Sequence, residues 1–147
     1  MPQSQTWEMR EVAGTPFDFR GGMRVGQHIR CGSDPQILRG RGYDHSWIDG
    51  TQPRSEARLM ARLAHSASGR TLEIFSNQPA VQVYTGNFLD GTAVGKSGLA
   101  YRQGDGIALE PQLLPDTPNR SEFGSARLDP GDRYTHDMML HLPVTGA

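Results

Sequence analysis

The sequence predicts an all-β protein built from antiparallel sheets. Of its 147 residues, 35% are hydrophobic and 18 are glycine, which is a lean and turn-rich composition. Short segments with period-two alternation are separated by turn signals, the pattern of strands joined by hairpins. A chain of this length fits one domain, so we expect residues 1–147 to form a single domain, with the polar segment 1–11 ragged.

The first third of the chain is expected to hold little regular structure. We expect a loop or edge segment over 14–22, a short helical turn over 23–29 and an irregular loop over 31–42. Strands are expected to dominate afterwards, over 43–48, 57–64, 71–76, 81–84, 106–110 and 134–142. The longer connections are interpreted as loops over 87–99 and 113–123, with a turn at 129–132.

The segment 57–64 fits either a helix or a strand. Apolar and small residues occupy alternate positions, whereas Arg58, Met60 and Arg62 occupy the positions between them. This period of two favours a strand. The turn formers Ser68 and Gly69 then predict a hairpin into the strand that follows.

Composition and charge exclude several classes of function. The 15 basic and 16 acidic residues give a net charge of -1, so no basic surface recommends nucleic acid. The single cysteine, Cys31, excludes an internal disulfide and leaves no need for an oxidising compartment. No cationic segment followed by an apolar run starts the chain, and no apolar stretch reaches the roughly 18 residues of a membrane span. We therefore expect a cytoplasmic protein without nucleic-acid or membrane partners.

No cofactor and no metal ion are expected. The Cys, His and Asp residues lack the spacing of metal ligands. The only hint of a phosphate loop, Gly95-Lys96-Ser97, lacks the glycine that the motif requires five residues before Gly95, where the sequence has Asp90.

The most informative stretch is residues 82–92, Gln-Val-Tyr-Thr-Gly-Asn-Phe-Leu-Asp-Gly-Thr. It resembles a signature of the aldose 1-epimerase (galactose mutarotase) family. Gly42-Tyr43-Asp44-His45 resembles a second motif of that family, and residues 106–112 and 115–119 resemble its glutamate-bearing strand and the loop after it. The order and spacing of these motifs also fit, so the resemblance extends from about Val12 to Leu142.

The resemblance implies a fold and an activity. The fold would be part of the large galactose mutarotase-like β-sandwich, and the activity would be interconversion of the α and β anomers of a hexose. Mutarotation needs a base that takes the proton of the anomeric hydroxyl and an acid that protonates the ring oxygen. The family's chains are longer, and this sequence is expected to correspond to their C-terminal half only.

The family pattern assigns roles to particular residues of this sequence. Glu110 would be the catalytic base, and the alternative is a surface glutamate at a strand end. Asp44 and Gln82 would bind sugar hydroxyls, because carboxylates and amides pair with vicinal hydroxyl groups. Tyr84 and Asn87 are weaker candidates for substrate binding, since Tyr84 also suits a core and Asn87 also suits a role in shaping its loop.

The family's catalytic acid is a histidine in a His-x-Tyr-Phe-Asn-Leu-like motif, and this sequence contains no such motif. The five histidines occupy other positions, and we interpret His45 as a structural residue behind the site. We therefore expect an isomerase of the aldose 1-epimerase type that is inactive or weak as this chain alone. A companion N-terminal-half chain would supply the missing histidine. Self-association is also expected, because half a sandwich leaves an apolar sheet face and unpaired edges exposed, but it cannot restore a motif that both copies lack. The alternative is a non-catalytic carbohydrate-binding or structural remnant.

Overall fold

The computed structural model describes residues 9–143, and strands dominate its regular structure. The elements in chain order are η1 (Val25–Gln27), α1 (Pro35–Gly40), β1 (Asp44–Ile48), β2 (Arg58–His65), β3 (Arg70–Ser76), β4 (Ala80–Tyr84), β5 (Asp90–Val94), β6 (Ala100–Arg102), β7 (Ala108–Gln112), η2 (Thr117–Asn119), η3 (Ser121–Phe123) and β8 (Met138–His141). The all-β prediction is confirmed. Of the segment predicted to be ragged, residues 1–8 lie outside the described part.

The chain is divided into two compact units, each built from two segments. Unit 1 comprises Met1–His45 and Val83–Ala108, and unit 2 comprises Ser46–Gln82 and Leu109–Ala147. The single domain expected over residues 1–147 stays a prediction. No helix within residues 9–143 is long and apolar enough to span a membrane.

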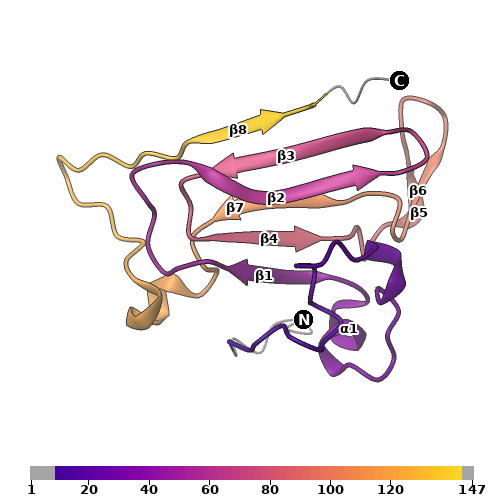
Figure 1. The fold of residues 1–147 in the computed structure, drawn as a ribbon, viewed down its shortest axis with the longest axis horizontal. Helices are drawn as coiled ribbons and strands as arrows, with labels where there is room; N and C mark the ends of the chain where they lie inside the picture. Colours follow the sequence, from indigo (N-terminus) through magenta and orange to yellow (C-terminus); the bar gives the residue numbers. More distant parts are fainter. Residues whose placement is uncertain (1–8, 144–147) are drawn as a thin grey trace. The chain divides into compact units, whose positions relative to one another are not determined.

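In unit 2, β2, β3 and β8 form an antiparallel sheet in that order (Figure 1). The predicted hairpin joins β2 to β3, with Gly69 in the left-handed conformation at a φ of 67°. The choice of strand over helix for residues 57–64 is confirmed. Period-two alternation predicted it correctly because successive side chains of a strand point to opposite faces.

The last strand is shorter than predicted. Only Met138–His141 pairs with β3, although the alternation suggested a strand over 134–142. The preceding residues are bound by one backbone hydrogen bond, from Asn77 N–H to the carbonyl of Asp137 at 3.3 Å, and by side chains. The amide of Asn77 donates to the carbonyl of Thr135 at 3.4 Å, and its oxygen accepts the N–H of Asp137 at 3.1 Å. Alternation alone does not distinguish these two ways of satisfying an extended backbone.

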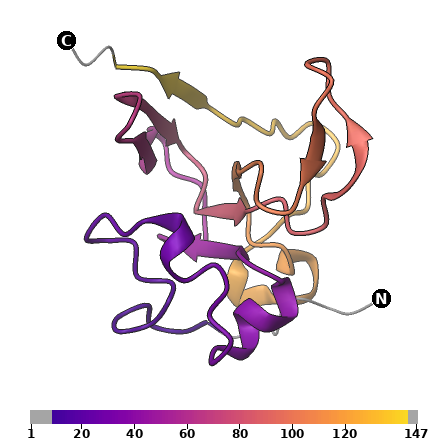
Figure 2. The ribbon, with the colours of Figure 1, turned by 90° about the vertical axis from the view of Figure 1, so that its right-hand side faces the viewer.

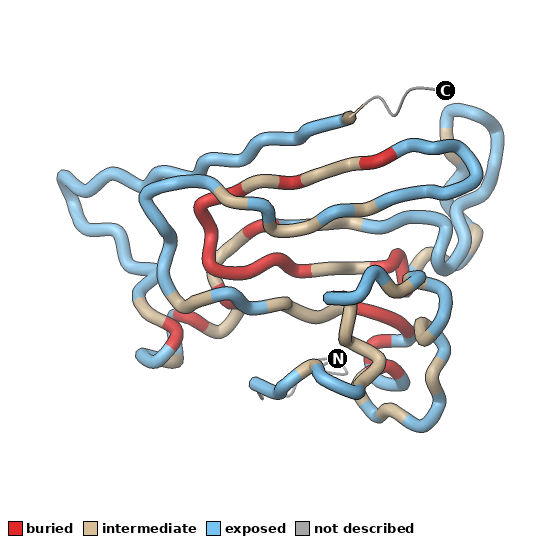
Figure 3. The backbone as a smooth tube through the Cα atoms, viewed as in Figure 1, coloured by how far each residue is buried: buried red, intermediate tan, exposed pale blue. Residues whose placement is uncertain are grey.

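A second sheet has β4 between β1 and β7. The run of residues 76–82, which connects β3 to β4 and enters β4, is buried throughout (Figure 3). In unit 2, Ala80 of this run packs against the buried side chains of Leu114 and Phe123. Phe123 belongs to a segment predicted as a loop, which contains the short turns η2 and η3. That connection therefore supplies part of the core.

The irregular loop predicted over residues 31–42 is wrong, because it contains the helix α1. Asp34 caps the helix: one carboxylate oxygen accepts the backbone N–H groups of Gln36 and Ile37 at 2.8 and 3.2 Å. Pro35 occupies the first helical position, where its missing N–H costs nothing. Asp and Pro residues are common in loops, yet Asp34 and Pro35 here start a helix whose Ile37 is buried.

Loss of this cap should be measurable. We expect Asp34→Ala to lower the free energy of unfolding by about 1 kcal/mol, because two N–H groups lose their acceptor. Urea unfolding followed by circular dichroism would measure the change. Asp34→Asn keeps a capping oxygen and should lose much less. An alanine variant as stable as the parent would show that packing of Ile37 alone holds the helix.

The loop predicted over residues 87–99 is also wrong, since β5 lies in it and pairs with β6 in an antiparallel hairpin of unit 1 (Figure 2). The hairpin turns between Gly95 and Gly98, whose backbone groups are hydrogen-bonded at 3.0 Å. A Cβ at Gly95 would lie 2.2 Å from the hydroxyl of Tyr101, so the Tyr101 side chain can lie against the turn only because Gly95 lacks one. The glycines that suggested a loop instead permit a tight hairpin.

Candidate functional site

Two segments of unit 1, residues 42–45 and 84–87, are held together by buried hydrogen bonds. The carbonyl of Tyr43 accepts the backbone N–H of Thr85 at 3.1 Å and the side-chain amide of Asn87 at 2.8 Å. The N–H of Tyr43 donates to the Thr85 hydroxyl oxygen at 3.0 Å, and that hydroxyl donates to Asn87 Oδ1 at 2.6 Å. The structure thus joins two sequence motifs that are 42 residues apart.

Gly42 permits this close approach. Its φ is 139°, a conformation that residues with a side chain rarely adopt. A Cβ there would lie 2.4 Å from Asn87 Oδ1 and 2.9 Å from Thr85 Oγ1. The glycine is therefore required by packing against the second segment as well as by its backbone angle.

The side chain of Tyr43 connects the same segment to the N-terminal part of unit 1. Its ring is completely buried and makes edge contacts with Phe17 and Phe19 at centroid distances of 5.8 and 5.2 Å. Its hydroxyl donates to the carbonyl of Pro16 at 2.7 Å. Burial raises the pKa of Tyr43 to about 12, so its hydroxyl remains a neutral donor at physiological pH.

Asp44, a predicted sugar ligand, is the first residue of β1 and is half-buried. It follows directly on the Tyr43 carbonyl that Thr85 and Asn87 hold in place. Its own N–H donates to Nδ1 of His45 at 2.9 Å. The peptide group between Tyr43 and Asp44 is therefore held at both its carbonyl and its N–H, which limits the directions in which Asp44 can present its carboxylate.

The two weaker candidates, Tyr84 and Asn87, make bonds within unit 1. The hydroxyl oxygen of Tyr84 accepts the N–H of Phe88 at 3.1 Å. Both polar ends of the buried Asn87 side chain are bonded to the chain itself, so the structure gives it a role in shaping the loop. Phe88 is exposed, and the guanidinium of Arg41 lies over its ring at 5.6 Å from the centroid.

Unit 2 contains the other two predicted residues. Gln82 lies on β4 and is buried, with Oε1 accepting a short hydrogen bond from the Ser46 hydroxyl on β1. The Ser46 hydroxyl therefore orients the Gln82 amide. Glu110 lies on β7, next to β4 in the sheet order, and is exposed. An exposed carboxylate is accessible to a ligand, as a base that acts on a substrate must be.

The structure thus brings the motif of Asp44 together with that of Tyr84 and Asn87, and it places Gln82 and Glu110 on neighbouring strands. The idea that all five side chains share one sugar site stays a prediction. Sequence reasoning missed Ser46 and Thr85. Thr85 lies within the motif 82–92 and Ser46 directly follows the motif 42–45, and small hydroxyl side chains often bond such neighbours.

Among residues 9–143, no group of three or more His, Cys, Asp or Glu side chains could hold a metal ion. The candidate residues in this part of the chain carry carboxylates, which accept hydrogen bonds, and amides and hydroxyls, which both donate and accept them.

The fold and these residues define a protein of antiparallel sheets whose glycine-dependent contacts hold carboxylate and amide side chains in place. Comparison with known proteins identifies the family. The family model described as aldose 1-epimerase matches residues 1–141. The chain belongs to the aldose 1-epimerase family.

Individual relatives agree. Galactose mutarotase from Bos taurus is 42% identical over 139 residues, and that from Homo sapiens is also 42% identical; each match covers 95% of this chain and 38% of the relative. Aldose 1-epimerase from Escherichia coli is 33% identical over 130 residues, which cover 86% of this chain and 36% of that protein. The chain thus spans little more than a third of the length of these curated relatives.

Proposed function

We propose that this chain acts in an aldose 1-epimerase, an isomerase that interconverts the α and β anomers of a hexose by opening and closing the sugar ring. The observation that carries the proposal is an exposed carboxylate, Glu110 on β7, within a chain that belongs to this family. The relatives named galactose mutarotase and aldose 1-epimerase support the same reaction and a sugar substrate.

In the proposed reaction, Glu110 takes the proton of the anomeric hydroxyl as the ring oxygen receives one. The bond between the anomeric carbon C1 and the ring oxygen breaks and the ring opens. C1 then rotates about the C1–C2 bond, and the ring closes with the hydroxyl on the other face. Asp44 and Gln82 hold the sugar by hydrogen bonds to its hydroxyls. Tyr84 offers an apolar ring face for the pyranose. Asn87 contributes by holding the Tyr43 carbonyl that precedes Asp44.

The reaction also needs an acid for the ring oxygen. The family uses a histidine in a motif that this sequence does not contain. We propose that a further part of the family fold, on a companion chain that associates with this one, supplies this histidine. We propose that the protein is located in the cytoplasm, because a chain with the single cysteine Cys31 and a balanced charge needs no oxidising compartment.

Polarimetry tests the proposal. The rate at which α-D-galactose reaches anomeric equilibrium would be measured with this chain alone. It would then be measured after adding the part of bovine galactose mutarotase that the chain does not match. We expect little acceleration from the chain alone, because loss of a positioned acid costs about 10²–10⁴ in rate. The mixture should restore a clear acceleration above that of either component.

Two other results would change the conclusion. Binding of galactose, detected by NMR titration, without acceleration in either sample would favour the alternative of a non-catalytic carbohydrate-binding protein. Full acceleration by the chain alone would contradict the need for a further part, and it would require an acid within residues 1–147.

A further inference from the structure

His45 follows the proposed sugar ligand Asp44 and binds it by an unusual route. Nδ1 of the His45 ring accepts the backbone N–H of Asp44 at 2.9 Å. A ring nitrogen can accept a hydrogen bond only when it carries no proton, so this contact requires a neutral imidazole with its proton on Nε2. The ring thereby closes a small cycle with the peptide group that joins the two residues.

The ring of His45 is fixed by its surroundings in unit 1. Phe17 makes an edge contact with it at a centroid distance of 4.8 Å. On the side of α1, a Cβ placed at Gly40 would lie 3.5 Å from the ring carbon Cε1, so the helix end comes close to the ring. The imidazole therefore has little freedom to turn away from the Asp44 amide.

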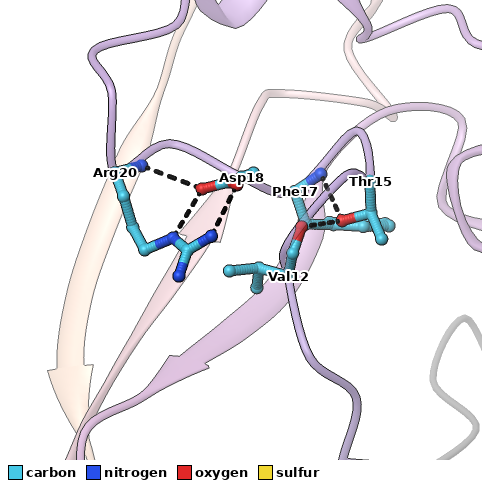
Figure 4. Close-up of polar contacts among 5 residues, drawn as sticks. All are labelled: Val12, Thr15, Phe17, Asp18 and Arg20. Carbon is cyan, nitrogen blue, oxygen red and sulfur yellow. Dashed lines mark hydrogen bonds and ion pairs between the residues drawn. The ribbon is translucent and has the colours of Figure 1, made fainter.

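Phe17 lies in a turn that has polar contacts before and after it in the sequence (Figure 4). Its backbone N–H donates to the Thr15 hydroxyl oxygen at 3.2 Å, and that hydroxyl donates to the carbonyl of Val12 at 2.6 Å. Next to it, Asp18 and Arg20 form an ion pair at 2.8 Å. The segment that contacts the His45 ring is thus a turn held by hydrogen bonds and followed by an ion pair.

The other ring nitrogen, Nε2, is buried and has no hydrogen-bond partner among residues 9–143. A buried donor without a partner costs about 1–3 kcal/mol. The contact that His45 does make, through Nδ1, is directed at Asp44. Within residues 9–143, the hydrogen bonding of the ring is therefore at Nδ1 alone.

We propose that His45 is a positioning residue for Asp44: its neutral imidazole holds the Asp44 backbone amide and so presents the carboxylate to the sugar. This inference rests on the proposed function, because it assigns His45 to the sugar-binding group. It differs from that function in being testable on the protein without sugar.

The arrangement makes sugar binding sensitive to acid. Protonation of Nδ1 would set an N–H against the N–H of Asp44 and break the contact. Burial lowers the pKa of His45 from its usual value of about 6.5, while Asp44 and Asp34 oppose this shift. Near Phe17, the charges of Asp18 and Arg20 neutralise each other. The contact is therefore intact at pH 7 and is lost as the pH falls through the lowered pKa.

The free energy of unfolding depends on pH in the same direction as sugar binding: both decrease as the pH falls. Below about pH 6.5 the unfolded chain binds a proton at His45 more readily than the folded chain does. The free energy of unfolding contributed by His45 is thus complete above that pH and decreases as the pH falls toward the folded-state pKa.

Two variants separate the hydrogen bond from simple filling of space. His45→Asn places an oxygen where Nδ1 lies, so it keeps the acceptor although it is smaller. His45→Gln fills more of the space but places its polar atoms nearer the position of Nε2. The positioning role predicts that Asn preserves the downfield Asp44 amide signal in ¹⁵N NMR spectra and that Gln does not. If volume alone mattered, Gln would be the better replacement.

The tautomer is measured first, on the wild-type chain without sugar. Long-range ¹H–¹⁵N correlation should show Nδ1 unprotonated at pH 7.5. A proton on Nδ1, or an Asp44 amide that is indifferent to all His45 variants, would overturn the proposal. This arm does not depend on whether the chain binds sugar.

Sugar binding is the second arm, measured by NMR titration with D-galactose from pH 7.5 down through the pH at which the His45 ring signals show protonation. As the pH falls, the affinity of the wild type for D-galactose should decrease about fivefold to tenfold, the usual contribution of one hydrogen bond. The affinity of His45→Asn should change little. His45→Gln should be weaker by a similar factor at every pH. Equal pH profiles for wild type and His45→Asn would refute the positioning role. No binding by any variant would refute the proposed function instead, and with it the assignment of His45 to sugar binding.

Discussion

Replacing Glu110 with Gln is expected to lower the rate of galactose mutarotation by about 10²–10⁴, the usual contribution of a positioned acid or base. The amide keeps the size of the side chain and its place on β7 but cannot take a proton from the anomeric hydroxyl. The measurement is polarimetry of the chain together with the part of bovine galactose mutarotase that it does not match. The loss should appear in kcat, with KM changed much less, because the substituted group acts in the reaction itself.

Glu56→Gln provides the matched control. Glu56 is also an exposed glutamate of unit 2, and the same change there should leave the rate unaltered. Both variants should unfold at the same urea concentration as the parent, since neither side chain is buried. A Glu110→Gln protein that retains the parental kcat would show that another residue is the base, and the role proposed for Glu110 would be abandoned.

The second large effect is on stability. We expect Gly42→Ala to lower the free energy of unfolding by about 3 kcal/mol or to prevent folding of unit 1. A φ of 139° is strained for any residue with a Cβ, at a cost of about 1–3 kcal/mol. The new methyl group would also displace Asn87 Oδ1, which lies 2.4 Å from its position. If Asn87 moves, its hydrogen bond to the Tyr43 carbonyl breaks, and this buried carbonyl loses one of its donors.

Gly21→Ala is the control for this prediction. Gly21 is exposed in the same unit, no atom lies within 4 Å of a Cβ built there, and its φ is not in the left-handed region. The alanine should be neutral or slightly stabilising, because it restricts the unfolded chain. Urea unfolding followed by tryptophan fluorescence and by circular dichroism would measure both variants. Equal stability of Gly42→Ala and the parent would mean that the two motif segments separate without cost.

The strands were predictable where a simple period governs them. Residues 57–64 alternate, and β2 forms there, because a strand places successive side chains on opposite faces. The hairpin at Gly69 was predictable because its turn formers are local. Residues 31–42 and 87–99 were not, since the same Gly, Asp and Pro residues serve in loops, helix starts and hairpin turns. Only the cap at Asp34 and the contact between Gly95 and Tyr101 decide among these.

The candidate residues show the same division. Resemblance to the aldose 1-epimerase family singled out Asp44, Gln82, Tyr84, Asn87 and Glu110, because motif residues keep their identity and order along the chain. It did not reveal what each side chain does in the fold. Asn87 was a candidate ligand, and its burial against Tyr43 and Thr85 gives it a structural role. Ser46 was not singled out, yet it orients Gln82.

The sequence by itself determined the all-β class, the hairpin between β2 and β3 and the family. These depend on local periodicity, on turn residues and on the identity of motif residues, which are all properties of the chain order. The tertiary structure decided why Gly42 is a glycine, which nitrogen of His45 bears a proton and which partner Asn87 binds. The first and the last depend on atoms of segments that are distant in sequence and meet only after folding. The second depends on a hydrogen bond to the adjacent Asp44, which forms only in the backbone conformation of the folded chain.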